Sequence, residues 1–408
     1  QLGEAASKYN SITRLDFEGP LPAQRVRRAL DAVLMRHPHL ASLFDSELNN
    51  ESFMLVPLLP DGKSPSEEAG APQRDGLWPF TEMTLSVTAA NEIEAALDGL
   101  QQQELERDFA IGAADAGMLL HALLVHCGDN RHSLFITAHH LVVDGWSTPI
   151  LLNDLLTALA RGADSLTATR VDYATVVRQL FQRDVDASHA IWRSALAGVS
   201  PTLLFHNAQT EAQVHEYELL IPKPLEQALI RRGREQGLTM NTLMQGAWGA
   251  FVSLMSGRDD VVFGSPVSGR FSPVDGIEEH IGLFSNTIPV RMTLNPQRPL
   301  IEQLKKLQQQ QIELLEHDGL GLADIQRLVG ESNLFDTLLV VENYPDQSDL
   351  RARDYHGARL LGIENRGYTH YPVTVLVLPG ESLRLLIEYR HFQDGSKQNP
   401  NAMAERLI

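Results

Sequence analysis

The most informative stretch of this chain is residues 138–147, which read Ala138-His139-His140-Leu141-Val142-Val143-Asp144-Gly145-Trp146-Ser147. An apolar run precedes it, so we predict that the two histidines stand at the end of a β-strand and enter a loop. An imidazole at a strand end has a rigid support, which suits proton transfer near neutral pH. Neighbouring residues of a strand point to opposite faces, so only one ring can face a given pocket. A lone histidine in such a place is most often structural, so its neighbours have to decide between the two interpretations.

The residues after the histidines suit turn formation or catalysis. Asp144 lies four positions beyond His140 and can fix the turn or pair with a cation. Gly145 allows a sharp turn and a close substrate approach, and its amide, near the next predicted helix, can donate to a developing oxyanion. A metal site at His140 and Asp144 has no third ligand nearby. A nucleophilic Ser147 lacks the Gly-x-Ser-x-Gly turn, so both of these interpretations are weak.

Composition places the chain among acidic globular proteins. Its 408 residues predict two or three domains, and 43% hydrophobic with 21% charged residues predicts packed cores rather than disorder. Lys and Arg number 34 against 52 Asp and Glu, and the net charge of −18 repels nucleic acid and anionic membrane surfaces. The single Cys127 excludes an internal disulfide and Cys-rich zinc sites. No apolar run approaches the roughly 20 residues of a spanning helix and the start shows no secretion signal, so we expect a soluble, cytoplasmic protein.

Helices and strands are interspersed through both halves of the chain, which predicts an α/β fold. The mixture favours a two-lobed α+β sandwich, in which sheets are backed by helices. The segment Gly198–Pro201 is the clearest break between the halves, and Asp61–Asp75 has the composition of an exposed loop. Helices are predicted at Leu21–His37, Pro149–Ala160, Asp172–Leu196, Pro224–Gln236, Thr239–Met255 and Arg298–Glu316. Strands are predicted at Met118–Cys127 and His132–Thr137, which form a hairpin, and at Val214–Ile221, Val261–Val267, Leu334–Glu342, Pro372–Leu378 and Ser382–Tyr389.

Several motifs of the chain resemble those of condensation domains of nonribosomal peptide synthetases. The string His139-His140-x-x-x-Asp144-Gly145 is shared across the chloramphenicol-acetyltransferase-like superfamily. The Trp146-Ser147 that follows resembles the residues at this point in the peptide-bond-forming members of the superfamily. The other matching segments occur in the order expected for the family and cover most of the chain. They are Arg36–Leu40, Val171–Ala174, Gly264–Arg270, Ile281–Arg291 and Leu334–Thr337.

The chain also departs from the family pattern at three places. Ala41 stands where the family usually has a second arginine, so any salt bridge of that arginine is absent. The family's opening motif is not recognisable at Gln1, so we expect a chain trimmed at its start from a larger synthetase. The segment Glu316-His317-Asp318 matches a later family motif only loosely, and it receives no role.

The resemblance implies a fold and a reaction. Two chloramphenicol-acetyltransferase-like lobes, at residues 1–170 and 171–408, would form a V-shaped pseudo-dimer with His140 on the tunnel between them. The amine of an aminoacyl acceptor on one carrier protein would attack a donor acyl or peptidyl thioester on another carrier, which forms an amide bond. The phosphopantetheine arms belong to the carriers, so no metal and no tightly bound cofactor is expected. An adenylation domain of the same synthetase is the expected neighbour.

The resemblance also implies roles for single residues. His140 would be the general base, or it would position the amine and stabilise the tetrahedral species, and both roles stay open. His139 would support the loop, and the Gly145 amide would belong to the catalytic group. Asp144 would be structural and pair with Arg270 across the lobes, with Arg291 as the reserve partner. The tunnel would be lined by Trp146, Ser147, Ser285 and Asn286.

The carrier proteins are expected to dock without long-range attraction. Carriers are usually acidic, as this chain is, so short-range contacts through basic or apolar patches have to hold them. Arg25, Arg27 and Arg28 form one such patch on the first predicted helix, although a solvated helix face is the commoner interpretation.

Other functions stay open at this point. A free-standing acyltransferase would act on a soluble amine, and a silent member of the family would only recruit another enzyme to a carrier protein. An epimerisation domain shares the histidine string, but Trp146-Ser147 and the Ile281–Arg291 match argue against it. A cyclising domain would carry an Asp-x-x-x-x-Asp string where His139 and His140 stand.

Overall fold

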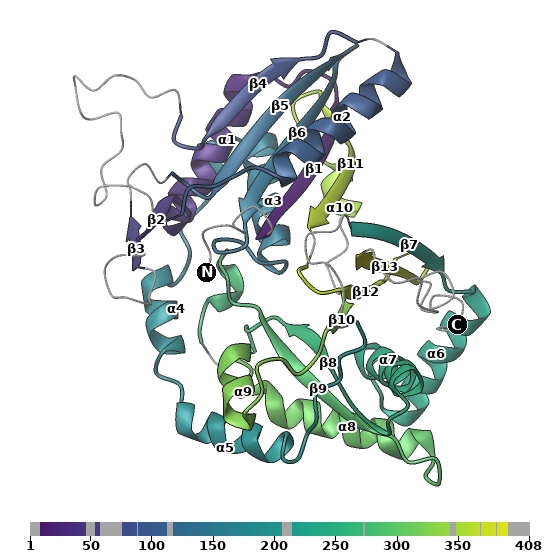
Figure 1. The fold of residues 1–408 in the computed structure, drawn as a ribbon. Helices are drawn as coiled ribbons and strands as arrows, with labels where there is room; N and C mark the ends of the chain where they lie inside the picture. The colour runs from purple at the N-terminus through teal and green to yellow at the C-terminus, as the bar shows by residue number, and fades with distance from the viewer. Residues whose placement is uncertain are drawn as a thin grey trace. The chain divides into compact units, whose positions relative to one another are not determined.

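The structure is a computed structural model (Figure 1). None of its described helices is long and apolar enough to cross a membrane. The expected loop at Asp61–Asp75 lies outside the described residues. The described ranges are 9–45, 54–57, 76–87, 89–111, 117–205, 214–271, 274–342, 348–367, 369–380 and 382–390.

The chain divides into two compact units, and each unit draws on separate parts of the sequence. The first unit contains Gln1–Val177, Asp275–Leu283 and Tyr344–Tyr368. The second contains Arg178–Val274, Phe284–Asn343 and Thr369–Ile408. The division expected from the sequence, 1–170 and 171–408, treats each lobe as one continuous piece, whereas two later segments return to the first unit. Hydrophobic periodicity does not reveal such returns, because it shows which face of a strand is buried but not which sheet the strand joins.

A five-stranded sheet forms the base of the first unit. Its strands are β1 (Asn10–Glu18), β4 (Phe80–Thr84), β5 (Leu120–Gly128), β6 (Arg131–His139) and β11 (Arg359–Gly367). They are ordered β11-β1-β6-β5-β4, so the late strand β11 extends a sheet made by the first third of the chain. β5 and β6 form the predicted hairpin, and the left-handed Asp129 (φ 48°) and Asn130 (φ 59°) make its tight turn.

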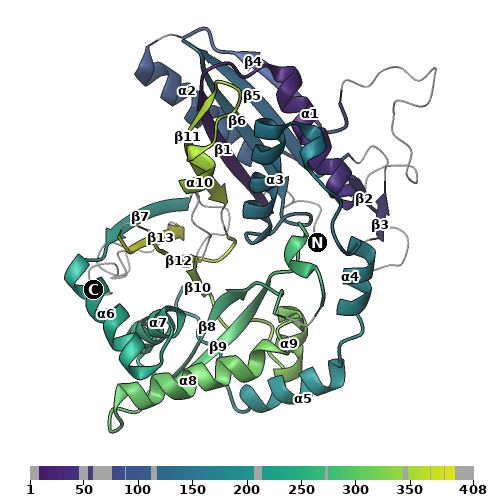
Figure 2. The same ribbon diagram turned by 180° about the vertical axis from the view of Figure 1, so that it is seen from behind.

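Helices cover both faces of this first sheet (Figures 1 and 2). They are α1 (Ala23–Arg36), α2 (Ala90–Leu105), α3 (Ser147–Arg161) and α10 (Ser348–Ala352), beside the short pair β2 (Ser42–Asp45) and β3 (Met54–Pro57). α1 and α3 pack together on one face, where Leu30 and Leu155 are fully buried. α2 lies on the other face, where Leu97 packs with Ile12 and Phe135. The predicted helices at residues 21–37 and 149–160 are confirmed.

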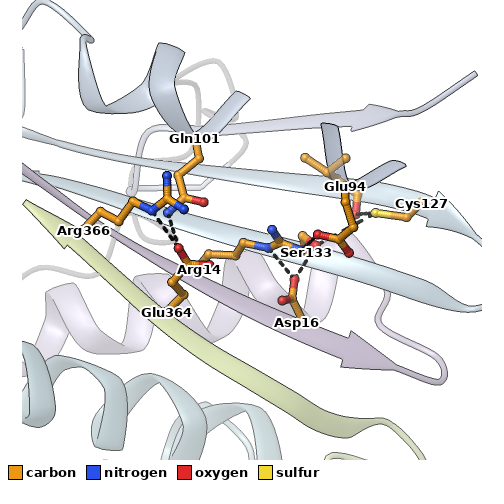
Figure 3. Close-up of polar contacts among 9 residues, drawn as sticks. Arg14, Asp16, Glu94, Gln101, Cys127, Ser133, Glu364 and Arg366 are labelled. Atoms are coloured by element: carbon orange, nitrogen blue, oxygen red, sulfur yellow. Dashed lines mark hydrogen bonds and ion pairs between the residues drawn. The ribbon is translucent and has the colours of Figure 1, made fainter. Parts of the chain in front are cut away.

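The face under α2 carries a polar network as well as apolar contacts (Figure 3). Arg14 of β1 is 5% exposed and donates to Asp16 at 2.8 Å and to Glu94 at 3.0 Å. Gln101 of α2 donates to Glu364 of β11 at 3.4 Å. Polar contacts therefore tie α2 both to the first strand and to the strand that arrives from late in the chain.

Six strands form the sheet of the second unit. They are β7 (Val214–Leu220), β8 (Asp260–Val267), β9 (Asn286–Thr293), β10 (Thr337–Val341), β12 (Val373–Leu378) and β13 (Arg384–Arg390). Their order is β7-β13-β12-β10-β8-β9. β10 and β12 run parallel, whereas β13 pairs antiparallel with both β12 and β7. The five strands that the sequence predicts in this part of the chain are confirmed within a few residues at their ends.

Two groups of helices cover this second sheet unequally. They are α6 (Lys223–Gln236), α7 (Met240–Ser256) and α8 (Leu300–Leu315) on one face, and α5 (Val185–Ala195) and α9 (Leu322–Val329) on the other. The first group buries Trp248 and Leu304 against Val375 and Ile387. The second group packs through Trp192 on β8, β9 and β10. Among the described residues, this second apolar cluster does not extend to β7, β12 or β13.

The single helix predicted at Asp172–Leu196 is wrong. The structure has two helices there, α4 (Tyr173–Leu180) and α5, with a break between them. The carboxylate of Asp184 accepts from the amide of Ala187 at 2.9 Å and caps α5. Apolar residues continue at helical spacing on both sides of the break, so periodicity alone hides it, and Asp184 is the N-cap signal that locates it.

Candidate active site

The hairpin places the two histidines at the end of a strand, as the sequence predicts. His139 is the last residue of β6, and His140 begins the loop. Backbone pairing holds both, because the His139 amide donates to the carbonyl of Leu119 at 2.9 Å and the His140 amide donates to the carbonyl of Tyr9 at 2.8 Å. The surroundings of the two rings differ, since His139 is 1% exposed and His140 is half-buried.

His139 has the contacts of a supporting group. Its Nδ1 accepts from the amide of Leu141 at 3.1 Å, so the proton of the neutral ring sits on Nε2. The rings of Tyr9 and Phe109 lie 6.3 Å and 6.4 Å from its centroid. A buried ring with these neighbours holds the start of the loop in place.

His140 has the opposite tautomer. Its Nδ1 lies 3.1 Å from the carbonyl oxygen of Val143, and because a carbonyl only accepts, Nδ1 carries the proton. Nε2 then carries the lone pair, and no described residue bonds to it. Burial lowers the pKa of His140, and the Val143 carbonyl and the charge of Asp144 oppose this effect only in part. The ring is therefore neutral near pH 7, and Nε2 can accept a proton or a hydrogen bond.

Asp144 and Ser147 fasten the loop to the returning segment Asp275–Leu283. The Oδ1 of Asp144 accepts from the amide of Ser147 at 2.8 Å and from its hydroxyl at 2.7 Å. The Ser147 Oγ also lies 2.9 Å from both the amide nitrogen and the carbonyl oxygen of Gly282. Asp144 and Ser147 are 1% and 0% exposed, while Gly145 between them is half-buried. Asp144 has structural contacts, and Ser147, expected on the tunnel, lies inside this junction.

Two further histidines anchor the same returning segment. The Nε2 of His39 donates to the carbonyl of Ile281 at 2.7 Å, and the Nε2 of His280 donates to the carbonyl of Val171 at 2.8 Å. His39 also stacks on Tyr173, with centroids 3.7 Å apart. Burial lowers the pKa of His39 to about 3 and also lowers that of His280. Two neutral histidines therefore connect the motifs at Arg36–Leu40 and Val171–Ala174 with the returning segment Asp275–Leu283.

The candidate partners of Asp144 belong to the second unit. The Arg270 guanidinium lies 4.7 Å from the ring centroid of Phe284. Arg291, named as the reserve partner, forms an ion pair with Asp260 at 2.8 Å and is committed within its own unit. The Asp144–Arg270 pair stays a prediction.

The other expected tunnel residues lie in both units. Trp146 of the first unit is 39% exposed. In the second unit, Ser285 is half-buried and Asn286 is the first residue of β9. The side-chain amide of Asn286 donates to the carbonyls of residues 318 and 320, both at 2.7 Å. Asn286 therefore holds the segment after α8 in place.

Comparison with known families agrees with this arrangement. A family model described as "Condensation domain" matches residues 74–396, which is most of the chain. The chain belongs to the condensation domain family. The predicted family is therefore confirmed, and with it the class of peptide-bond-forming acyltransferase.

The curated relatives are much longer than this condensation domain. It is 48% identical over 398 residues to vanchrobactin synthetase VabF of Vibrio anguillarum, an alignment that covers 98% of the chain and 14% of VabF. It is 32% identical over 390 residues to chondramide synthase cmdD of Chondromyces crocatus, over 93% of the chain and 9% of cmdD. The chain thus corresponds to a small part of each of these proteins.

A solved structure supports the fold of this condensation domain. The first condensation domain of the calcium-dependent antibiotic synthetase, in complex with a substrate analogue, matches with a TM-score of 0.77 at 20% sequence identity. The match covers 100% of this chain and 91% of that one. The predicted mixed α/β fold with two lobes is confirmed.

Two condensation-domain motifs of the second unit have a packing role. A Cβ on Gly264 would lie 2.3 Å from the ring of Phe335 and 2.4 Å from Leu338. Gly269 has φ 66°, and a Cβ there would lie 1.8 Å from the carbonyl oxygen of Phe284. Glycine is therefore required at both positions, and the motifs at 264–270 and 334–337 meet through this contact with Phe335.

Sequence reasoning missed how the returning segment is anchored. Nothing local marks His39, His280 or Gly282 as anchors of the returning segment, because their contacts join residues more than 100 positions apart. Asp318, which received no role, is 1% exposed and lies 3.5 Å from Arg183, and burial raises its pKa. The motif match at Ile281–Arg291 was the available signal for the segment, but it did not name the contacts.

Proposed function

We propose that this condensation domain joins a carrier-bound donor thioester to the amine of a carrier-bound aminoacyl acceptor, with His140 acting at that amine. The supporting observation is the tautomer of His140, which leaves the Nε2 lone pair of a neutral, half-buried ring available. The amine nitrogen attacks the thioester carbonyl carbon, the C–N bond forms and the C–S bond breaks. The proton that leaves the nitrogen ends on the sulfur of the departing pantetheine thiol.

His140 and Gly145 have complementary roles in this proposal. An aminoacyl amine has a pKa of about 7 to 8, so it needs only modest help to become nucleophilic. His140 either removes its proton or holds the amine for attack, and the Gly145 amide donates to the oxyanion of the tetrahedral species. Positioning two tethered reactants contributes further, since effective molarities of such reactions reach about 10⁵ M or more.

The proposal also covers the substrate tunnel, a structural ion pair and the partners of the domain. The proposal includes Trp146, Ser285 and Asn286 as residues of the substrate tunnel and Asp144–Arg270 as a structural ion pair. Membership of a family that works in peptide synthetase assembly lines supports carrier proteins as partners. They bring the phosphopantetheine arms, no metal or tight cofactor takes part, and a neighbouring adenylation domain supplies substrate in the cytoplasm.

Carrier docking is proposed to involve short-range contacts. Of the three arginines on α1, Arg25 donates to the carbonyl of Tyr355 at 3.1 Å, and the Arg27 guanidinium lies 4.1 Å from the centroid of Phe80. Of the three, Arg28 is exposed, whereas Arg25 and Arg27 are half-buried. Arg25 and Arg27 are therefore engaged within the protein, which leaves a smaller basic patch for contact with a carrier. This supports weak docking of an untethered carrier.

The test is condensation between two loaded carrier proteins, followed by intact-protein mass spectrometry. We expect the donor mass to leave the first carrier and appear, as an amide, on the second. Transfer to soluble amines alone would indicate a free-standing acyltransferase. Inversion at the donor α-carbon without transfer would indicate an epimerisation domain, and binding without any reaction would indicate a recruitment module.

A further inference from the structure

A glutamate in the sheet of the second unit is buried without a partner. Glu388 of β13 is 7% exposed, and its carboxylate makes no hydrogen bond and no ion pair with any described residue. Carboxylates in protein interiors are normally paired or hydrogen-bonded, because an uncompensated buried charge destabilises the fold. Burial, together with repulsion from Glu216 and Glu342, raises the pKa of Glu388 to about 8.

The neighbours of Glu388 make its surroundings more negative. The register of β13 with β7 places Glu216 directly opposite Glu388, and Thr374 of β12 is its partner on the other side. Directly opposed residues of antiparallel strands share a face, where two like charges destabilise the pair. Burial also raises the pKa of Glu342, which follows β10, to about 7. Glu216 and Glu342 therefore both add negative charge to the surroundings of Glu388.

The arginines of the same strand are directed to other groups. Arg390 donates to the carbonyl of Thr369 at 2.7 Å and attracts Glu388 only from beyond ion-pair distance. Arg384 pairs with Glu218 at 3.2 Å. No described cation is therefore bonded to Glu388.

Among the described residues, the apolar cluster on the face that carries Glu388 does not reach β13. Leu385 and Ile387 of the same strand pack into the apolar cluster under α6, α7 and α8, so Glu388 points to the opposite face. The apolar cluster of α5 and α9 on that face includes residues of β8, β9 and β10 but none of β13. The hydroxyl of Thr369 lies 2.6 Å from the hydroxyl of Thr374, which is the cross-strand neighbour of Glu388. The segment before β12 therefore lies beside the part of the sheet that contains Glu388.

We propose that Glu388, with Glu216 and Glu342 around it, is a subsite for a cationic group of the substrate, a guanidinium or a primary ammonium. This inference rests on the proposed function, because the cation is the side chain of a carrier-bound aminoacyl group. A charged side chain supplies the partner that the fold does not provide, and its hydrogen bonds to carboxylates are strong. A neutral isostere leaves the carboxyl group unpartnered, so the subsite selects for charge.

The test compares substrates that differ in charge and little in shape. Arginyl and citrullyl thioesters form one pair, and lysyl and norleucyl thioesters form the other, each offered as donor and as acceptor. For at least one pair we expect kcat/KM to be about tenfold or more higher for the charged member. Glu388→Gln should bring that ratio within about twofold. Glu218→Gln, on an exposed glutamate of the same sheet, is the matched control and should keep the parent ratio.

Agmatine binding gives a readout that does not need turnover. Agmatine carries a guanidinium and no thioester, and it should raise the melting temperature of the parent and of Glu218→Gln but not of Glu388→Gln. If Glu388→Gln does not fold, the exposed Glu216→Gln replaces it and should lower the charge preference about two- to threefold.

The outcomes separate this proposal from the proposed function. Ratios near one for both substrate pairs overturn the subsite and leave Glu388 as a neutral buried carboxyl group only. Agmatine binding that depends on Glu388, without condensation of any substrate, overturns the proposed function and retains a cation site. Equal agmatine binding by the parent and Glu388→Gln overturns the site itself.

Discussion

Glu104 in the first unit and Glu388 in the second are both buried glutamates, but their surroundings differ. The carboxylate of Glu104 lies 2.5 Å from Arg107, 2.9 Å from His121 and 2.9 Å from the hydroxyl of Thr137. Burial alone would raise the pKa of Glu104, but the hydrogen bonds from His121 and Arg107 outweigh it and lower the pKa to about 2. Glu388 is buried without such partners, and burial raises its pKa to about 8. Partners rather than burial therefore decide the charge of these two groups.

Residues 138–147 contain the same contrast, between the neighbouring His139 and His140. The Nδ1 of His139 accepts from the amide of Leu141 in the loop, and the ring is buried. His140 uses Nδ1 to hold Val143 and keeps Nε2 available. A polar group whose bonds are all made inside the protein supports the fold, whereas one with an unused bonding position can serve a ligand or a reaction.

The largest expected effect tests this distinction at the histidines. His140→Ala should lower amide formation by about two to four orders of magnitude if the ring transfers a proton, and by about tenfold if it only positions the amine. The melting temperature should change little, because the ring is half-buried. His139→Ala should lose stability first and rate second. Mass spectrometry of the carrier-bound product and a thermal melt measure both variants, and an unchanged rate for His140→Ala would refute the site.

The second prediction compares the two glutamates directly. Glu104→Gln should reduce the free energy of unfolding by about 3 kcal/mol at pH 7, because Arg107 and His121 lose a buried charged partner. Glu388→Gln should be neutral or stabilising at the same pH, since it replaces a carboxyl group without a partner. Urea unfolding of both variants measures the difference. Equal losses in the two would break the comparison between the units.

The third prediction gives the two glutamates opposite pH dependences. The folded pKa of Glu104, about 2, lies below the ordinary value of 4.5, so its contribution is present above pH 4.5 and is lost as the pH falls toward 2. The folded pKa of Glu388, about 8, lies above 4.5, so its contribution is present below pH 4.5 and is lost as the pH rises toward 8. Glu388→Gln should therefore flatten the decline in stability between pH 5 and pH 8. Unfolding free energies across that interval decide the matter, and an identical slope in parent and variant would contradict the assignment.

The fourth and smallest effect concerns the junction at Ser147. Ser147→Ala removes a hydroxyl shared by Asp144 and Gly282 and should lower the free energy of unfolding by about 1 to 3 kcal/mol. Thr148→Ala is the matched control, because the Thr148 hydroxyl makes only a 3.4 Å contact with the carbonyl of Asp144. Thermal melts of the two variants should differ clearly, and equal melting temperatures would show that the junction contributes nothing.

Local sequence signals predicted the elements around the site well. The Gly128-Asp129-Asn130 turn between two apolar runs located the hairpin, and apolar spacing located α1 and α3. β1 escaped prediction because Arg14, a charged residue, occupies a buried position and obscures the alternation of the strand. α2 escaped because its buried face includes the polar Gln101 and Glu104. Tertiary hydrogen bonds make these polar groups tolerable inside, and no local pattern shows them.

The sequence by itself determined the strand end with its two histidines, the turn before it and the family motifs, because each depends on residues close together in the chain. Tertiary structure decided the rest. The contact of Ser147 with Gly282 across 135 positions and the pairing of Glu388 with Glu216 both follow from which segments meet. Proton positions and charges depend on such neighbours, so the chemistry of a buried polar group is fixed only when the chain has folded around it.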